Sequence, residues 1–281
     1  MFKTIGIVGV GLIGGSFAKS AKKLGLCEKI IGIDINPDYL QTAKNLGLID
    51  EFGALETMVT LCDFIIVAIP VNATRAVLPK ILNLCTNQIV VDAGSTKAGI
   101  CGSVKNHVHR ANFIAAHPIA GTENSGPEAA VEGLYEGKMN IICESNLSNP
   151  EFLQKAIAFF NALQMKTLFM DAEEHDRHIA YVSHLSHISS FVLGQTVLEI
   201  EKDEKNIFNM AGSGFASTVR LAKSSPQMWA PIFQQNKDAL STALSAYIQN
   251  LQNFKNLIEQ EEGEKLIELM TDVNRIRKVI G

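Results

Sequence analysis

The sequence lacks the features that direct proteins to membranes, nucleic acids or oxidising compartments. Its five cysteines are irregularly spaced and form no Cys-x-x-Cys pair, so we expect reduced, mostly buried thiols. It has no run of about eighteen apolar residues and no basic segment followed by an apolar one at its start, so we expect neither a membrane span nor a signal peptide. A net charge of −4 indicates no nucleic-acid partner. Together these absences predict a cytoplasmic protein.

The sequence also lacks repeats, low-complexity segments and flexible linkers. Its length of 281 residues predicts two domains. Up to residue 170, short β-rich runs alternate with helical patterns, and most runs are continuously apolar, as in strands covered by helices on both faces. We predict strands at 2–8, 30–34, 64–69, 88–92, 112–116, 139–143 and 166–170, and helices near 13–25, 37–46, 55–61, 73–84 and 151–164. This order predicts a doubly wound α/β domain over residues 1–170.

The residue pattern changes at Asp171: from there on, glycine is scarce and apolar residues recur every three or four positions. We predict helices near 173–201, 214–223, 226–258 and 262–279, and therefore an all-α domain over residues 171–281. The third helix would begin at Ser225-Pro226 and extend roughly 45–50 Å. Since one small helical domain does not bury a helix of that length, we expect part of it to pack against a second subunit. The alternative is a long helix within a single subunit.

The most informative segment is the glycine triplet Gly9-x-Gly11-x-x-Gly14, which ends an apolar run and precedes a helical pattern. In that context a triplet indicates dinucleotide binding, because the glycines permit a tight turn, a close backbone approach to the pyrophosphate and close packing of helix on strand. Asp34 ends the second apolar run, twenty residues beyond Gly14, where a carboxylate accepts hydrogen bonds from a ribose. No Arg or Lys follows it to meet a 2′-phosphate. We therefore predict a Rossmann domain that binds NAD rather than NADP; the alternative is a βαβ unit with chance glycines.

Three polar clusters follow later strands, where ligands bind in open α/β sheets. Pro70 turns the chain after one strand, either to flank the nicotinamide ribose or only to end the strand. Ser95 and Lys97 lie in Asp-Ala-Gly-Ser-Thr-Lys. Ser95 is a candidate to hydrogen-bond a substrate hydroxyl, and Lys97 is a candidate to orient polar groups or neutralise a carboxylate. The alternative is a helix cap by Ser95 or Thr96. His117 follows an apolar strand, where an imidazole of near-neutral pKa suits proton removal during hydride transfer; the alternative is a structural histidine that caps a turn. The residues expected to hold the dinucleotide are Gly9, Gly11, Leu12, Ile13, Gly14, Asp34, Pro70 and Ser95.

The helical part adds polar residues to apolar surroundings. His184 and His187 share one helix face, and Arg220 is flanked by apolar residues, so it is a candidate clamp for a carboxylate or else a solvated surface side chain. His175 and His178 precede them. No cysteine accompanies these histidines and no His-Glu-x-x-His pattern is present, so we expect a polar pocket wall and no metal site.

Taken together, these motifs resemble the prephenate dehydrogenase family, in family order and over nearly the whole length. The Asp-x-Gly-Ser-x-Lys and His-Pro-Ile-Ala-Gly motifs are the most specific. The matching segments are the glycine triplet with Gly15-Ser16, Asp34, Pro70, Asp92–Lys97, His117–Gly121, Ser183–His187, Arg220 and Ser225–Trp229.

The resemblance implies NAD-dependent oxidative decarboxylation of prephenate to 4-hydroxyphenylpyruvate in tyrosine biosynthesis, by a homodimer joined through its helical domains. It implies that His117 takes the proton of the substrate hydroxyl with support from Ser95. It further implies that Arg220 holds the ring carboxylate, that His187 and His184 contact the pyruvyl side chain, and that Glu123 gates or tunes the site.

The sequence departs from the family at 216–217, where many relatives carry charged residues, and it leaves no room for a fused chorismate mutase or ACT domain. Three other functions remain open. An arogenate dehydrogenase would act on an ammonium-bearing substrate. A β-hydroxyacid dehydrogenase would rely on a lysine where His184 and His187 stand. A non-catalytic NAD sensor would leave Ser95, His117 and Arg220 without a role.

Overall fold

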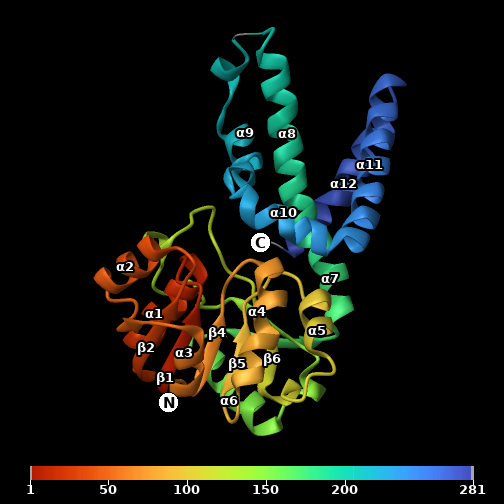
Figure 1. The fold of residues 1–281 in the computed structure, drawn as a ribbon. Helices are drawn as coiled ribbons and strands as arrows, with labels where there is room; N and C mark the ends of the chain where they lie inside the picture. The colour runs from red at the N-terminus through yellow and green to blue at the C-terminus, as the bar shows by residue number, and fades with distance from the viewer. Residues whose placement is uncertain (1, 205, 280–281) are drawn as a thin grey trace. The chain divides into compact units, whose positions relative to one another are not determined.

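The computed structural model describes residues 2–204 and 206–279, and its N-terminal part is built on an eight-stranded sheet (Figure 1). The strands lie in the order β3-β2-β1-β4-β5-β6-β7-β8. All neighbouring strands are parallel except β6 and β7, which are antiparallel. Their bounds are β1 Phe2–Val8, β2 Cys27–Ile33, β3 Glu51–Phe52, β4 Phe64–Val67, β5 Ile89–Asp92, β6 Phe113–Pro118, β7 Met139–Cys143 and β8 Lys166–Met170.

Helices cover both faces of this sheet, which explains why its central strands are apolar throughout. Helices α1 (Leu12–Lys23), α2 (Pro37–Asn45) and α6 (Pro150–Ala162) pack on one face around an aromatic cluster that includes Phe17 and Phe159. The other face is covered by α3 (Leu55–Leu61), α4 (Val71–Leu84), α5 (Ala98–Val104) and α7 (Ala172–Ile179), and α10 (Pro226–Gln235) packs on α4. The doubly wound α/β prediction is thereby confirmed, although the short elements β3 and α5 carried no sequence signal that we recognised.

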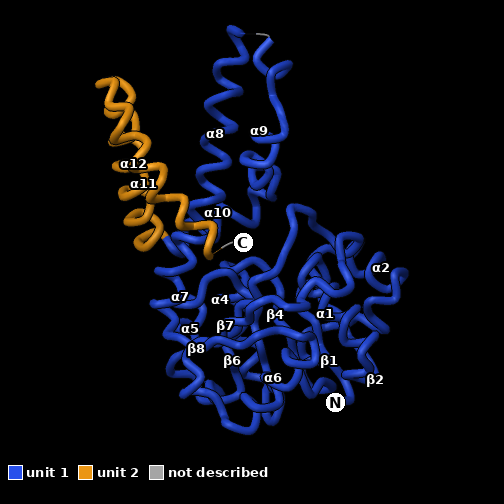
Figure 2. Tube along the Cα trace, turned by 180° about the vertical axis from the view of Figure 1, so that it is seen from behind, with its two compact units in different colours: residues 1–236 blue, residues 237–281 orange. Residues whose placement is uncertain are grey.

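The helical region contains α7, α8 (Leu185–Glu201), α9 (Ser213–Thr218), α10, α11 (Lys237–Glu259) and α12 (Gly263–Val273). By compactness the chain divides into residues 1–236 and residues 237–281, coloured separately in Figure 2. In the second unit α11 packs on α12. The domain boundary expected after residue 170 stays a prediction.

One expected element is corrected by the structure: the helix predicted over 226–258 is two helices, α10 and α11, separated at Asn236. Asn236 leaves helical dihedrals (φ −102°, ψ 29°), and its buried side-chain amide donates to the Asp176 carbonyl oxygen at 2.7 Å. The break therefore allows the Asn236 side chain to hydrogen-bond to the backbone of α7. At 23 residues α11 is about 34 Å long, shorter than expected.

The predicted helix over 173–201 is also interrupted, by a π-helical turn at Ala180–His184 between α7 and α8. Such turns insert an extra residue into a helix and are frequent at functional sites, because they change the direction of the side chains around them. Here the turn carries His184.

Candidate active site

The glycine triplet forms a cradle between β1 and α1 whose shape depends on the absence of side chains. Gly9 has φ +95°, and a Cβ there would lie 2.4 Å from the Ala68 carbonyl oxygen. A Cβ on Gly14 would lie 1.9 Å from the Gly9 carbonyl oxygen, so this glycine lets α1 approach β1. A Cβ on Gly11 would meet nothing within 4 Å. The space beside Gly11 is therefore open to a ligand.

The cradle has the donors that a dinucleotide requires. Helix α1 begins at Leu12, and because the first N–H groups of a helix have no intrahelical partner, those of Leu12, Ile13 and Gly14 are free to bind phosphate oxygens. Asp34 follows β2; its carboxylate accepts the backbone N–H groups of Val10 at 3.0 Å and Asn36 at 2.9 Å. These bonds fix the carboxylate and leave lone pairs for ribose hydroxyls. The residues present fit NAD.

Pro70 and Ser95 lie in the loops that follow β4 and β5. Pro70 is the N-cap residue of α4, so the chain turns into a helix directly after it. Ser95 is half-buried between β5 and α5, and the N-cap position of α5 belongs to Lys97. Ser95 therefore does not cap the helix, which leaves its hydroxyl available at the carboxyl edge of the sheet.

A buried ion pair joins β5 to β6 beneath this edge. The Lys97 ammonium contacts the Asp92 carboxylate, with both side chains fully buried, and donates to the Ala116 carbonyl oxygen at 2.6 Å. The Asp92 carboxylate also accepts the N–H groups of Gly94 at 3.0 Å and Ala116 at 3.1 Å. Lys97 thus neutralises a carboxylate of the protein, and the pair fixes the backbone immediately before His117.

His117 lies buried near the end of β6, with one ring nitrogen bonded to a second histidine. Its Nδ1 is 2.8 Å from His175 Nε2, and His175 Nδ1 is 2.8 Å from Asp176 Oδ1. Burial lowers the pKa of His117 well below 6.5, and His175, Lys97 and His184 lower it further when they are charged. Burial also lowers the pKa of His175, against the opposing effect of its bond to Asp176. Both imidazoles are therefore neutral at physiological pH.

His184 belongs to the same buried cluster. Its Nδ1 is 3.1 Å from the Asn236 amide nitrogen, and burial lowers its pKa to about 4. Since an amide nitrogen only donates, Nδ1 of the neutral ring must be the acceptor and Nε2 carries the proton. Among residues 2–204 and 206–279 this Nε2–H and the indole N–H of Trp229 are both buried without a partner, and the two rings lie edge to face at 5.9 Å.

His187 and Arg220 are nearer the solvent. The His187 ring stacks on Trp229 with centroids 3.4 Å apart, and its Nδ1 donates to the Ser183 carbonyl oxygen at 3.0 Å. Burial lowers the pKa of His187, and the nearby Arg220 charge contributes. Arg220 is 54% exposed and donates to the Glu123 carboxylate at 3.3 Å.

The charged and aromatic side chains from several elements therefore form one connected set. Hydrogen bonds run from His117 through His175, Asp176 and Asn236 to His184, and the Trp229 ring contacts both His184 and His187. The Arg220–Glu123 pair is near enough for the Arg220 charge to lower the pKa of His187. Sequence reasoning missed His175, Asp176 and Asn236 as parts of this set. The adjacent His-Asp pair was the available signal, but its partner is 58 residues away along the chain.

Among the residues that the structure describes, no cluster of three or more His, Cys, Asp or Glu side chains is arranged to hold a metal ion. Over the same residues, no helix is both long and apolar enough to cross a membrane.

Comparisons with known proteins agree over both halves of the chain. Residues 17–168 match the family model described as prephenate dehydrogenase, nucleotide-binding domain, and residues 171–272 match prephenate dehydrogenase, dimerization domain. The chain is 30% identical to the prephenate dehydrogenase of Bacillus subtilis, over 95% of this chain and 73% of that protein.

Two solved structures are similar over almost the whole chain. One is prephenate dehydrogenase from A. aeolicus with hydroxyphenyl propionate and NAD+, at 34% identity and a TM-score of 0.92, covering 100% of this chain and 99% of that one. The other is Synechocystis arogenate dehydrogenase, at 27% identity and a TM-score of 0.78, covering 99% and 100%.

Proposed function

Because the chain belongs to the prephenate dehydrogenase family, we propose that it catalyses the oxidative decarboxylation of prephenate to 4-hydroxyphenylpyruvate, a step of tyrosine biosynthesis. The protein is an NAD-dependent dehydrogenase. NAD, when bound, supplies the hydride acceptor. The observation that carries the proposal is a buried His117, hydrogen-bonded to His175, at the carboxyl edge of the sheet that also holds the dinucleotide cradle.

In this reaction the protein must remove the proton of the substrate hydroxyl and hold the substrate in position. His117 is the proton acceptor, because its pKa is lowered and the ring is neutral at physiological pH. Ser95 supports the same hydroxyl from the β5–α5 loop. Since aromatisation drives the loss of the ring carboxylate as CO₂, no strong electrophile is required of the protein.

Arg220 binds the ring carboxylate, for which its planar fork is suited. In the free protein it contacts Glu123, and both side chains are partly exposed. An exposed ion pair of this kind contributes about 0–1 kcal/mol, so exchanging Glu123 for a substrate carboxylate costs little. Glu123 therefore keeps Arg220 near the site without competing strongly for it.

The buried N–H groups of His184 and Trp229 favour prephenate over arogenate. Both groups are donors without an acceptor, and a keto oxygen or carboxylate provides one. Both substrates carry a side-chain carboxylate, but arogenate replaces the keto oxygen, the second acceptor, with an ammonium group that offers only further donors. With His187 stacked on Trp229, these side chains form a wall suited to the pyruvyl side chain.

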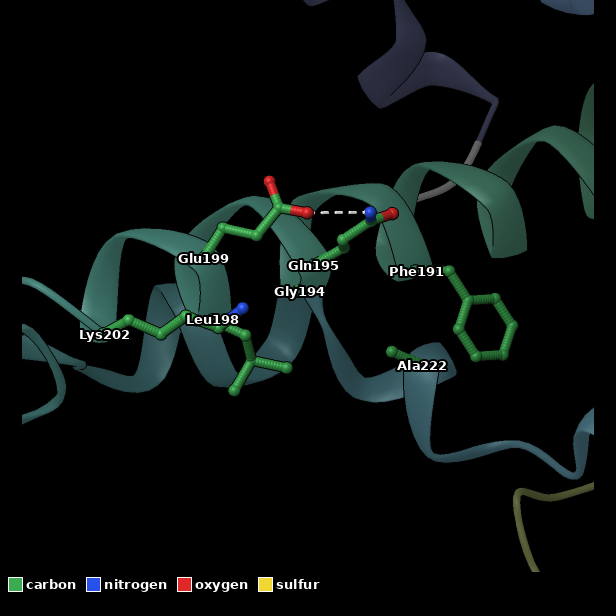
Figure 3. Close-up of a pocket in the computed structure, with 7 residues that line it drawn as sticks. All are labelled: Phe191, Gly194, Gln195, Leu198, Glu199, Lys202 and Ala222. Atoms are coloured by element: carbon green, nitrogen blue, oxygen red, sulfur yellow. Dashed lines mark hydrogen bonds between the residues drawn. The ribbon is translucent and has the colours of Figure 1, made fainter.

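We also propose a homodimer formed through the helical region. The family model that matches residues 171–272 is described as a dimerization domain. Helices α8 and α11 each expose large apolar side chains, namely Val192, Leu198, Ile200, Ile248, Leu251 and Ile258. Figure 3 shows an open, mainly apolar groove along α8, lined by Phe191, Gly194, Gln195, Leu198, Glu199, Lys202 and Ala222. Light scattering should give twice the chain mass of 30.6 kDa; a monomer would refute this assembly.

The experiment that tests the proposed reaction is NADH formation by the purified protein with NAD and either prephenate or arogenate. We expect kcat/KM to be at least tenfold higher for prephenate, because the free N–H groups reject an ammonium. A preference for arogenate would instead assign the reaction of the Synechocystis relative. Cofactor binding without turnover of either substrate would leave an NAD sensor.

A further inference from the structure

The orientation of His117 depends on a chain of hydrogen bonds that leads away from the substrate side. Among the described residues, only its Nδ1 has a hydrogen-bond partner, His175 Nε2. The two rings meet edge to face, with centroids 5.0 Å apart and planes at 64°. His175 is fully buried, so water does not replace this contact. The geometry of His117 is therefore set by α7, an element outside its own sheet.

The last member of the chain, Asp176, is held from two sides. Its Oδ1 accepts the N–H of Lys97 at 2.7 Å and its Oδ2 accepts that of Ala98 at 2.9 Å. Its carbonyl oxygen accepts the amide of Asn236. A carboxylate bonded in this way accepts hydrogen bonds. His175 Nδ1, which lies 2.8 Å from Asp176 Oδ1, must therefore carry a proton and donate a hydrogen bond to that oxygen.

The positions of the protons follow in sequence. A neutral His175 that carries its proton on Nδ1 has a lone pair on Nε2. That lone pair accepts from His117 Nδ1, which must then carry the proton of its own ring. The free nitrogen of His117, Nε2, is left with a lone pair.

We propose that His175 and Asp176 are positioning residues that fix His117 in the tautomer whose Nε2 accepts the substrate proton. The inference rests on the proposed function, in which His117 is that acceptor. In the step itself the substrate O–H bond breaks, its electron pair stays on oxygen, and an N–H bond forms at Nε2. The Nδ1–H bond remains donated to His175, and the Asp176 carboxylate stabilises the new positive charge through that ring.

The surroundings of His117 make this support necessary. The charged and titratable groups around it are His175 and Asp176 on α7, Lys97 before α5, His184 on the π-helical turn and Asp92 at the end of β5. Lys97 already pairs with Asp92, and its positive charge opposes a further positive charge on His117. Asp176 is hydrogen-bonded to His175, which is hydrogen-bonded to His117. It is therefore the carboxylate that stabilises the positive charge formed on His117.

Two substitutions of His175 distinguish a role in orienting His117 from a role in stabilising the fold. His175→Gln places an acceptor oxygen near the position of Nε2, whereas His175→Leu has similar bulk and no acceptor. We expect His175→Leu to lower kcat by about 10²-fold, within the range for loss of proton-transfer catalysis, with an unchanged Kd for NAD. We expect His175→Gln to recover at least tenfold of that loss. His178→Leu, an exposed position on the same helix, is the matched control and should keep full activity.

A second readout is the pH profile of kcat/KM. In His175→Leu the His117 imidazolium has lost its acceptor, so the acid limb should move to lower pH, while His175→Gln should resemble the unmodified enzyme. Equal kcat values for the Leu and Gln variants, or full activity of the Leu variant, would overturn the proposal.

If neither variant folds, NMR of the unmodified protein labelled at its histidine nitrogens decides the question, with His117→Asn used for assignment. We expect the proton of neutral His117 on Nδ1, and a proton on Nε2 would overturn the inference. This measurement needs no turnover. Its failure is therefore distinguishable from failure of the proposed reaction, which turnover of prephenate and arogenate by the unmodified enzyme tests separately.

Discussion

Replacing Gly11 with alanine separates binding of the dinucleotide from stability of the fold. Gly11 is the N-cap residue of α1 with φ −73°, a value that alanine adopts without strain. The added Cβ would meet no protein atom within 4 Å. It would instead occupy the open space beside the free N–H groups of α1, where we expect the pyrophosphate.

The expected magnitudes follow from these contacts. Alanine restricts the unfolded chain, which stabilises by about 0.4–1 kcal/mol, but it is a poorer N-cap than glycine, so the free energy of unfolding should change by less than about 1 kcal/mol. A methyl group that holds the phosphate away from one N–H removes a hydrogen bond to a charged group, worth about 1.5–3 kcal/mol. The Kd for NAD should therefore rise about 10- to 100-fold.

Calorimetric titration with NAD and urea unfolding measure the two quantities on the same samples. Two matched glycines act as controls. Gly14→Ala places a Cβ 1.9 Å from the Gly9 carbonyl oxygen, so it should lower the free energy of unfolding by about 1–3 kcal/mol or more. Gly102→Ala, in α5 with nothing within 4 Å, should stabilise slightly and leave NAD binding unchanged. Wild-type NAD affinity in Gly11→Ala would refute the cradle.

Three further predictions concern the charges of the site. Arg220→Ala should mainly raise KM for the substrate, since its fork binds the ring carboxylate, and steady-state kinetics with unchanged KM would remove that role. Lys97→Met leaves the fully buried Asp92 carboxylate without its partner and should lower the free energy of unfolding by about 3–5 kcal/mol, measured in urea; a loss below about 1 kcal/mol would contradict this. Because His117 acts neutral and its pKa is lowered, kcat/KM should fall only as pH drops below 6.5, and an acid limb above 6.5 would argue against His117 as the base.

Much of the N-terminal fold follows from local patterns in the sequence. The runs predicted at 2–8 and 139–143 are strands with the same bounds, and 64–69 and 88–92 are close, because buried parallel strands are apolar throughout. The element β3 escaped notice because it spans only two exposed residues, Glu51 and Phe52. Helix α5 escaped because its short sequence contains two glycines, which are poor helix formers.

The helical region was harder to predict because its interruptions depend on distant partners. Nothing in the spacing around Asn236 indicates a break; the residue leaves the helix to bond the Asp176 carbonyl oxygen, 60 positions away along the chain. The same holds for the candidate site. His117, Arg220 and the glycine triplet are recognisable from local context, whereas the role of His175 depends on a contact that only the fold creates.

We infer that His117 accepts the substrate proton and takes no part in binding the cofactor. This role of His117 is tested most directly by measuring kcat and the Kd for NAD on His117→Asn. We expect kcat to be about 10²–10⁴-fold lower and NAD affinity to be nearly intact. A variant that keeps full turnover would contradict it.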